Sequence, residues 1–183
     1  MPAEPPLIVS QLPRMPPRVA DVRELRGNGP WPSKSGGDLR VPISLPHAEL
    51  RRLLDYDLDE MAQLGRDIRG LRVFYIDGAR IGGVAGNQFH RIRTEIAFLV
   101  AGSARWEFED LHGGTRSFNA DRDCAVLIPP FVLHRAIFGA EGGTLATLTN
   151  TIFERDDPQT HDTYSIEIFR SLQTRMRQAP HAS

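Results

Sequence analysis

Two histidines and one carboxylate in the second half of the chain are the residues whose types and spacing favour chemistry. Gln88 and His90 are two positions apart, so on a strand their side chains point to the same face. His134 follows a turn that contains two prolines and opens another apolar run. If these runs are antiparallel strands facing one cavity, the two imidazoles lie close together. The spacing therefore predicts a histidine centre inside a β structure.

Glu95 adds a carboxylate to this pair and leaves two alternatives open. A histidine with an unperturbed pKa near ~6.5 transfers protons at neutral pH without a metal. Two imidazoles and a carboxylate are also a ligand set for Fe(II), Mn(II) or Zn(II), and Gln88 would be a fourth, weaker ligand. Glu95 is five residues from His90, so metal binding requires a bend within residues 91–94.

The elements that must position these residues change character at residue 71. Beyond it, short runs of branched and aromatic residues are separated by Gly, Asp or Pro, which is typical of an antiparallel sandwich or barrel. A stripe of apolar residues over 164–176 predicts a short C-terminal helix. The expected strands cover 71–76, 90–100, 104–109, 115–118, 125–128, 134–138 and 144–151.

The sequence before residue 71 is expected to extend this barrel. Prolines interrupt residues 1–37, which therefore form an arm with room for an edge strand over 19–25. Residues 38–70 are expected to supply a strand and one amphipathic helix packed on the barrel, which itself covers 71–178. The helix is predicted by an apolar stripe with Gly65 as its C-terminal cap, the stripe being Leu50, Leu53, Leu54, Met61 and Leu64.

The composition excludes several classes of protein. A net charge of −1 gives no long-range attraction to nucleic acid or to an anionic membrane. The single cysteine, Cys124, excludes an intrachain disulfide and a metal cage built from cysteines. The first residues lack the pattern of a signal peptide, and the apolar runs are too short to cross a bilayer. We expect a cytoplasmic protein that binds neither nucleic acid nor membrane.

The spacing around the two histidines resembles that of the cupin family. Gln88-Phe-His90, Glu95 and Gly102 follow the first cupin motif, with Gln88 in place of its first histidine. Pro129-Pro-Phe131-Val-Leu-His134 follows the second motif, with Phe131 in place of a glycine. The resemblance covers roughly residues 71–151 and implies an all-β protein, a cupin jelly-roll β-barrel with the N-terminal extension and the C-terminal helix added to it.

A narrower resemblance is to the nucleotide-sugar 3,4-ketoisomerases and WxcM-like cupins. The residues that carry it are Arg72-Val-Phe-Tyr-Ile76, His90, Gly102-Ser103, Leu127-Ile-Pro-Pro130 and the segment that ends at Phe169. It implies a homodimer that moves a keto group between neighbouring carbons of a dTDP-linked 4-keto-6-deoxyhexose, without metal or other cofactor. His90 would be the base, with Tyr75 or His134 as proton relay. The substrate-binding residues would be Gln88, Arg91, Arg93, Arg105 and Trp106, the arginines for the diphosphate and Trp106 for the base.

Several positions depart from the ketoisomerase pattern. Asp77 replaces a tyrosine, Ala85 an arginine and Gln88 a histidine, and Thr94-Glu95 stands where Glu-Gln is usual. Three functions therefore stay open: a ketoisomerase-like enzyme, a metal-dependent cupin acting as dioxygenase or isomerase, and a non-catalytic sugar-binding cupin. For single residues the alternative is a structural role, such as an ion pair between Glu95 and a neighbouring arginine.

Overall fold

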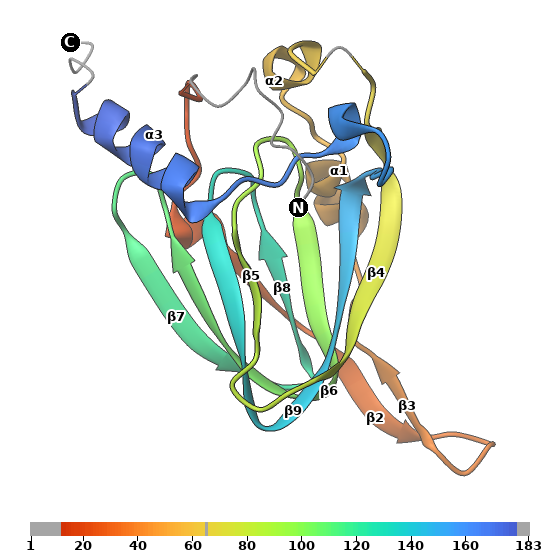
Figure 1. Cartoon of the computed structure of the whole chain (residues 1–183). Helices are drawn as coiled ribbons and strands as arrows, with labels where there is room; N and C mark the ends of the chain where they lie inside the picture. The colour runs from red at the N-terminus through yellow and green to blue at the C-terminus, as the bar shows by residue number, and fades with distance from the viewer. Residues whose placement is uncertain (1–11, 65, 179–183) are drawn as a thin grey trace.

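Two long strands organise the computed structural model, which describes residues 12–64 and 66–178 (Figure 1). They are β6 (Glu95–Glu109) and β9 (Leu133–Thr151), which pair with each other along most of their length. The pairing register shifts between residues 99 and 104, where both strands pass from one layer of the barrel to the other. Gly102 has a positive φ of 78°, and a Cβ there would lie 2.0 Å from the carbonyl oxygen of Gly142. Only glycine permits this close approach.

The shorter strands complete two layers. The first contains β1 (Arg23–Arg26), β8 (Cys124–Ile128), the first half of β6, the second half of β9, and β4 (Arg69–Ala79). The second contains β7 (Thr115–Ala120), the other halves of β6 and β9, and β5 (Val84–Gln88). Their inner faces meet in a core that joins Ala97 and Val126 of the first layer to Trp106 and Phe138 of the second. The predicted jelly-roll barrel is confirmed.

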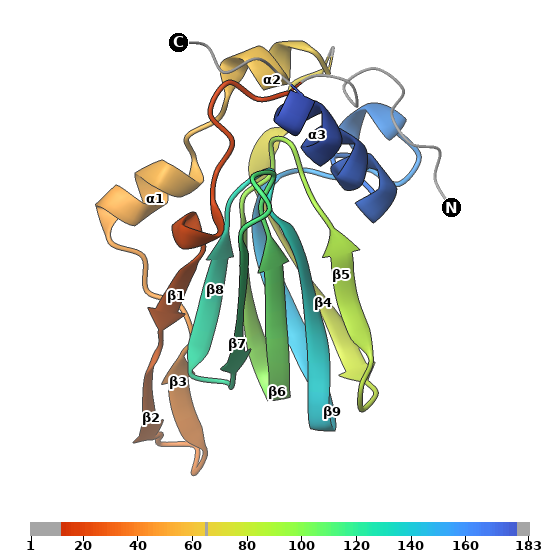
Figure 2. The same ribbon diagram turned by 90° about the vertical axis from the view of Figure 1, so that its left-hand side faces the viewer.

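Helices cover the barrel from outside. Leu53 of α1 (His47–Leu53) packs on Ile96 and Leu127 at the outer face of the first layer. Figure 2 shows α2 (Leu58–Ala62) and α3 (Ile166–Gln178) over one end of the barrel. The hairpin of β2 (Asn28–Pro32) and β3 (Asp38–Val41) projects beyond the other end. Two 3₁₀ turns, Val19–Asp21 and Pro158–Thr160, lie in the connections.

The structure divides the expected single helix after Pro46 into α1 and α2. Asp57 explains the break, because its carboxylate accepts the backbone N–H groups of Asp59 and Glu60 and so caps a new helix. The proposed cap Gly65 lies outside the described residues. The expected C-terminal helix is present as α3.

The strands also differ in detail from the expectation. The run 90–100 becomes a strand only at Glu95, and β5 had not been expected. The runs 134–138 and 144–151 are two halves of β9, because glycines at the bend let one strand turn the corner. Part of the expected proline arm forms β1, which pairs with β8 at the edge of the sheet. Within residues 12–64 and 66–178, no helix combines the length and apolarity needed to cross a membrane.

Candidate metal and catalytic centre

Three buried side chains meet between the two layers: His90 after β5, Glu95 at the start of β6, and His134 at the start of β9. Nε2 of His90 lies 3.2 Å from Oε1 of Glu95, and Nε2 of His134 lies 3.3 Å from Oε2. The three candidate ligand atoms are all within 4.8 Å of one another. The side chains of this His-Glu-His cluster come from separate elements, and the fold brings them together inside the barrel as expected for His90 and His134.

A tight loop, rather than a strand, joins His90 to Glu95. The carboxylate of Asp162 accepts the three consecutive backbone N–H groups of residues 91–93, at distances of 2.7 to 2.9 Å. The chain therefore curls around Asp162, and both His90 and Glu95 face the interior. This is the bend that their five-residue spacing required.

Backbone carbonyls fix the protons of both imidazoles. Nδ1 of His90 bonds to the carbonyl oxygen of Asp162, and Nδ1 of His134 lies 3.0 Å from the carbonyl oxygen of Val132. Because a carbonyl oxygen only accepts, each Nδ1 carries a proton, and each Nε2 of a neutral ring carries a lone pair. Both lone pairs face the carboxylate of Glu95. Nε2 of His90 and Oε1 of Glu95 have no hydrogen-bond partner within the described chain.

Burial and mutual contacts shift the pKa values of His90 and Glu95. Burial lowers the pKa of His90 despite the opposing effect of Glu95, which favours a neutral ring at pH 7. Burial by itself raises the pKa of Glu95, but interactions with His90 and His134 outweigh it and hold that pKa well below its usual value. The cluster is therefore an ionised carboxylate that faces the Nε2 atoms of both imidazoles. Such a set of donors attracts a cation.

A small cavity adjoins the cluster. Its volume is about 60 Å³, and its walls include Gln88, His134, Phe74 and Trp106. Gln88 stands opposite His134 in the pairing of β5 with β9. Because a water molecule takes roughly 30 Å³ in the liquid, the cavity has room for about two water-sized groups beside the cluster. It suits open positions next to a bound ion and is too small for a hexose as it stands.

Comparison with known proteins identifies the architecture. No family model matches the chain, and no curated protein matches it in sequence. The sugar 3,4-ketoisomerase QdtA of Thermoanaerobacterium thermosaccharolyticum, solved in complex with TDP, superimposes with a TM-score of 0.57 at 15% identity, over 86% of this chain and 98% of that one.

Two further solved structures are similar. The TDP-fucose-3,4-ketoisomerase WlaRA of Campylobacter jejuni gives a TM-score of 0.54 at 15% identity, over 86% of this chain and 98% of that one. The RmlC epimerase of Mycobacterium tuberculosis gives 0.55 at 15% identity, over 81% of this chain and 70% of that one. This chain has the cupin fold. Identities this low show the shared fold alone.

The turn before His134, which matches the second cupin motif, contains a residue with an unfavourable backbone conformation. Phe131, which stands where that motif has glycine, adopts a positive φ of 57°. This conformation favours glycine, so the backbone at Phe131 is strained. The backbone N–H of Phe131 donates to the carbonyl oxygen of His90 at 2.7 Å, which ties the turn before His134 to the other histidine of the cluster.

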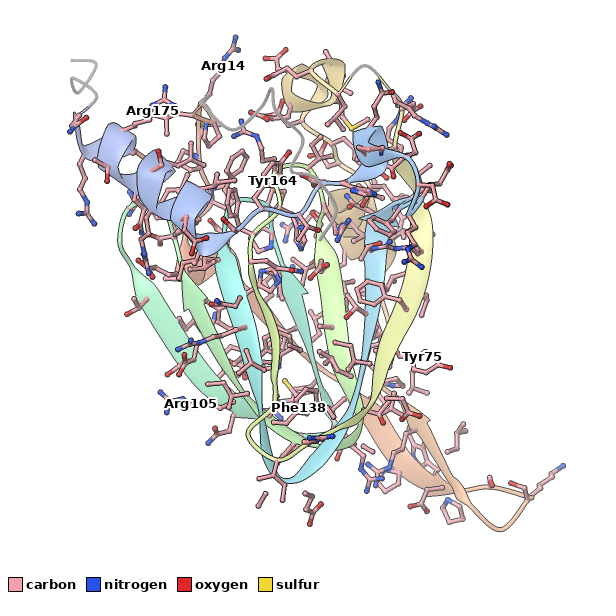
Figure 3. The ribbon with its side chains drawn as sticks, viewed as in Figure 1. Arg14, Tyr75, Arg105, Phe138, Tyr164 and Arg175 are labelled. Atoms are coloured by element: carbon pink, nitrogen blue, oxygen red, sulfur yellow. The ribbon has the colours of Figure 1, made fainter. Side chains whose placement is uncertain are left out.

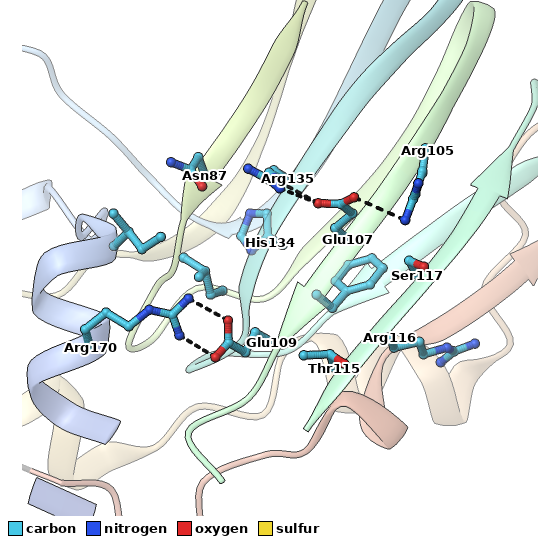
Figure 4. A pocket seen from close by; sticks show the side chains of 13 residues that line it. Asn87, Arg105, Glu107, Glu109, Thr115, Arg116, Ser117, His134, Arg135 and Arg170 are labelled. Atoms are coloured by element: carbon cyan, nitrogen blue, oxygen red, sulfur yellow. Dashed lines mark hydrogen bonds and ion pairs between the residues drawn. The ribbon is translucent and has the colours of Figure 1, made fainter. Parts of the chain in front are cut away.

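Two residues expected at the site point away from the barrel (Figure 3). Tyr75 is 69% exposed on the outer face of β4, because strand alternation directs Phe74 inward instead. Its expected role as a proton relay inside the barrel does not fit this position. Arg105 points outward from β6 and lines a groove of about 550 Å³ beside α3, where it pairs with Glu107 (Figure 4). Because side chains also alternate along β6, Arg105 lies on the outer face, away from the interior cavity.

Three other expected substrate-binding residues are buried with structural partners. Arg91 forms a paired contact with Glu60 of α2, with both nitrogen–oxygen distances at 3.0 Å. Trp106 belongs to the core and reaches the cavity only as part of its wall. Arg93 lies beside the cluster, with Nη1 3.5 Å from Oε1 of Glu95. The three arginines therefore do not share one face, because Arg91 and Arg93 are buried and Arg105 points outward.

Sequence reasoning missed Asp162 and Arg72. Asp162 shapes the loop that carries His90, but its bonds span about seventy residues, so no local pattern reveals them. Arg72 occupies the same cross-strand row as Thr149 and Glu95. Arg72 points inward because side chains alternate along β4. The sequence alone does not indicate which face of that strand is the inner one.

Proposed function

We propose that this chain is a metal-dependent enzyme of the cupin fold, in which His90, Glu95 and His134 hold a divalent ion such as Fe(II), Mn(II) or Zn(II). One observation carries the proposal. Two imidazole Nε2 atoms and an ionised carboxylate converge in a buried site, with both Nδ1 protons committed to backbone carbonyls. Without a metal ion, either three acceptors face one another or a buried imidazole carries a charge, and both are unfavourable in a site removed from water.

Two of the separations between donor atoms fit such an ion. With bonds of about 2.1 Å, neighbouring ligands of a tetrahedral or octahedral ion lie roughly 3.0–3.4 Å apart. The observed nitrogen–oxygen separations of 3.2 and 3.3 Å fall in this range. The carbonyls of Asp162 and Val132 would keep each Nε2 directed at the ion, as the hydrogen-bonded partners of metal-bound histidines do.

For the reaction we propose the isomerisation of a hydroxy-carbonyl compound of the keto-sugar class, as a metal-assisted process. Sugar isomerases and an epimerase among the structural neighbours support this class. A bound divalent ion supplies Lewis acidity toward a carbonyl oxygen. Gln88 lies at the cavity beside His134, where its amide can orient a substrate hydroxyl. The apolar walls formed by Phe74 and Trp106 exclude water.

Elemental analysis of protein purified without chelator tests the metal centre. We expect about one Fe, Mn or Zn ion per chain, and loss of most of it in Glu95→Gln and His134→Ala, because three protein ligands are the usual minimum. His112→Ala is the matched control, since His112 is exposed. Retention of the ion by both ligand variants, or no uptake of any of the three ions by folded wild-type protein, contradicts the proposal. Oxygen uptake by the iron-loaded protein would instead favour a dioxygenase at the same centre.

A second candidate is a metal-free nucleotide-sugar 3,4-ketoisomerase with His90 as the base. The fold match over nearly the whole of QdtA favours it, and the lone pair on Nε2 of His90 is suited to accept a proton. The cavity would have to open toward β4 and β5 to admit a hexose. The two candidates differ in whether the reaction survives removal of metal.

Deuterium exchange separates them. Chelator-treated protein is incubated in deuterated water with a dTDP-linked 4-keto-6-deoxyhexose, and label in the sugar is followed by NMR. Exchange that persists without metal and is lost in His90→Gln, but not in His112→Ala, supports the second candidate. Exchange that requires added metal supports the first. Binding without exchange under either condition indicates a sugar-binding cupin.

A further inference from the structure

Arg72 lies in the cross-strand row that leads through Thr149 to Glu95 of the His-Glu-His cluster. Its carbon Cζ lies 4.8 Å from the ring centre of Phe74 and 5.0 Å from that of Phe153, so the two rings hold the planar group between them. Nε of Arg72 is buried and has no hydrogen-bond partner in the part of the chain that the structure describes. Phe74 and Glu95 both line the small cavity.

Arg93 lies on the other side of the same region. It is 3% exposed, and its Nε donates to the hydroxyl of Thr151 at 3.1 Å. Nη1 is shared between Glu95 and Thr163, each at 3.5 Å. Nη2 is buried and has no partner among the described residues. A buried guanidinium nitrogen with an unused proton is costly unless something accepts it.

Arg72 and Arg93 both interact with the carboxylate of Glu95. Burial and the nearby positive charge of Arg93 lower the pKa of Arg72 to about 10, against an opposing effect from Glu95. Glu95 is therefore the carboxylate that serves both arginines and the two histidines. A divalent ion on the cluster would compete with both guanidinium groups for the negative charge of Glu95.

We propose that Arg72 and Arg93 form a binding site for an oxyanion group of the substrate, a carboxylate or a phosphate, next to the His-Glu-His cluster. Their unused N–H groups, Nε of Arg72 and Nη2 of Arg93, are the donors. Guanidinium groups suit such ligands because they donate in a planar fork. The site deepens the proposed function by naming an anionic substrate, but anion binding itself does not require the metal.

Thermal unfolding with added anions tests the site. Chelator-treated and metal-loaded protein are each heated in sodium phosphate, sodium acetate or sodium chloride of equal ionic strength. At ten times its dissociation constant, a specifically bound anion raises Tm by about 3–6 °C for a chain of this size. We expect this rise over chloride in wild-type protein with one of the two oxyanions, and its loss in Arg72→Gln. The better anion identifies the group as phosphate or carboxylate.

Arg69→Gln is the matched control, because Arg69 lies on the same strand but pairs with Asp67 on the surface. Arg93→Lys keeps the charge and removes the unused Nη2, so it should weaken the response without abolishing folding. An equal response in wild-type and Arg72→Gln protein, or no response to either anion in wild-type protein, overturns the inference. Elemental analysis of protein that was never exposed to chelator keeps the two proposals distinct. If that protein takes up none of the three ions and still binds the anion, only the metal centre is refuted.

Discussion

Asp162→Asn is the change that tests most directly how the fold builds the cluster. The Asp162 side chain is buried, and its two oxygens accept three backbone N–H groups, Oδ1 from Arg91 and Oδ2 from Ile92 and Arg93. Asparagine offers one oxygen in place of two, so at most the two bonds at Oδ2 are kept. Its amide then faces the N–H of Arg91, donor against donor.

The magnitude follows from these bonds. An unsatisfied buried N–H costs about 1–3 kcal/mol, and the two remaining bonds lose the strengthening that the carboxylate charge gives them. We expect the free energy of unfolding to fall by about 2–4 kcal/mol, a large part of the ~5–15 kcal/mol typical of a domain. The loop 91–94 should loosen, and His90 and Glu95 should separate. Urea unfolding measures the first effect, and the ion content after dialysis measures the second.

Asp121→Asn provides the comparison. Asp121 is exposed and accepts one backbone N–H, that of Asp123, at 3.0 Å. Its replacement should change stability little and leave the ion content unchanged. The reasoning is refuted if Asp162→Asn lies within about 0.5 kcal/mol of wild type and binds metal equally well.

Three further predictions concern other parts of the chain. Glu60→Gln should lower the free energy of urea unfolding by about 3 kcal/mol, because it breaks the buried pair with Arg91. Glu107→Gln, which breaks a more exposed pair with Arg135, is the control, and equal stabilities of the two variants would contradict the role of the buried pair. Burial raises the pKa of Tyr164 above the ~10 of an unfolded tyrosine, so the unfolded state loses its proton first and stability declines as pH rises beyond ~10. Tyr164→Phe should change the free energy of unfolding little at pH 7, because the hydroxyl has no partner in the described chain. Above pH ~10 its stability should fall less steeply with pH than that of the control Tyr75→Phe, and identical pH profiles of the two variants would contradict this. Leu71, Val73 and Tyr75 are 58, 65 and 69% exposed on one face of the edge strand β4, and we predict that the expected homodimer forms through this face. The double variant Val73→Lys and Tyr75→Lys should sediment as a monomer at concentrations where wild type is a dimer, and a monomeric wild type would refute the dimer.

The sequence by itself determined the β architecture and the pair of histidines. Alternating apolar runs and the turns between them locate most strands, because burial of one strand face imposes a period of two residues. The spacing of His90, Glu95 and His134 relative to the glycine and proline turns also lies in the local sequence, and the fold keeps it.

Only the tertiary structure decided which side chains serve the site. Tyr75 and Phe74 are neighbours in sequence, and the pairing of β4 with β9 sends one outward and the other to the cavity. Register is a property of two strands, so one strand's composition does not fix it.

The same limit applies to the loop that carries His90. Its curl depends on Asp162, and the burial of Arg91 depends on Glu60 thirty-one residues earlier. These contacts join segments that are distant along the chain, and each satisfies a polar group that burial would otherwise leave unpaired. The secondary-structure propensities of neighbouring residues do not indicate such partners, whereas the folded barrel brings them within bonding distance.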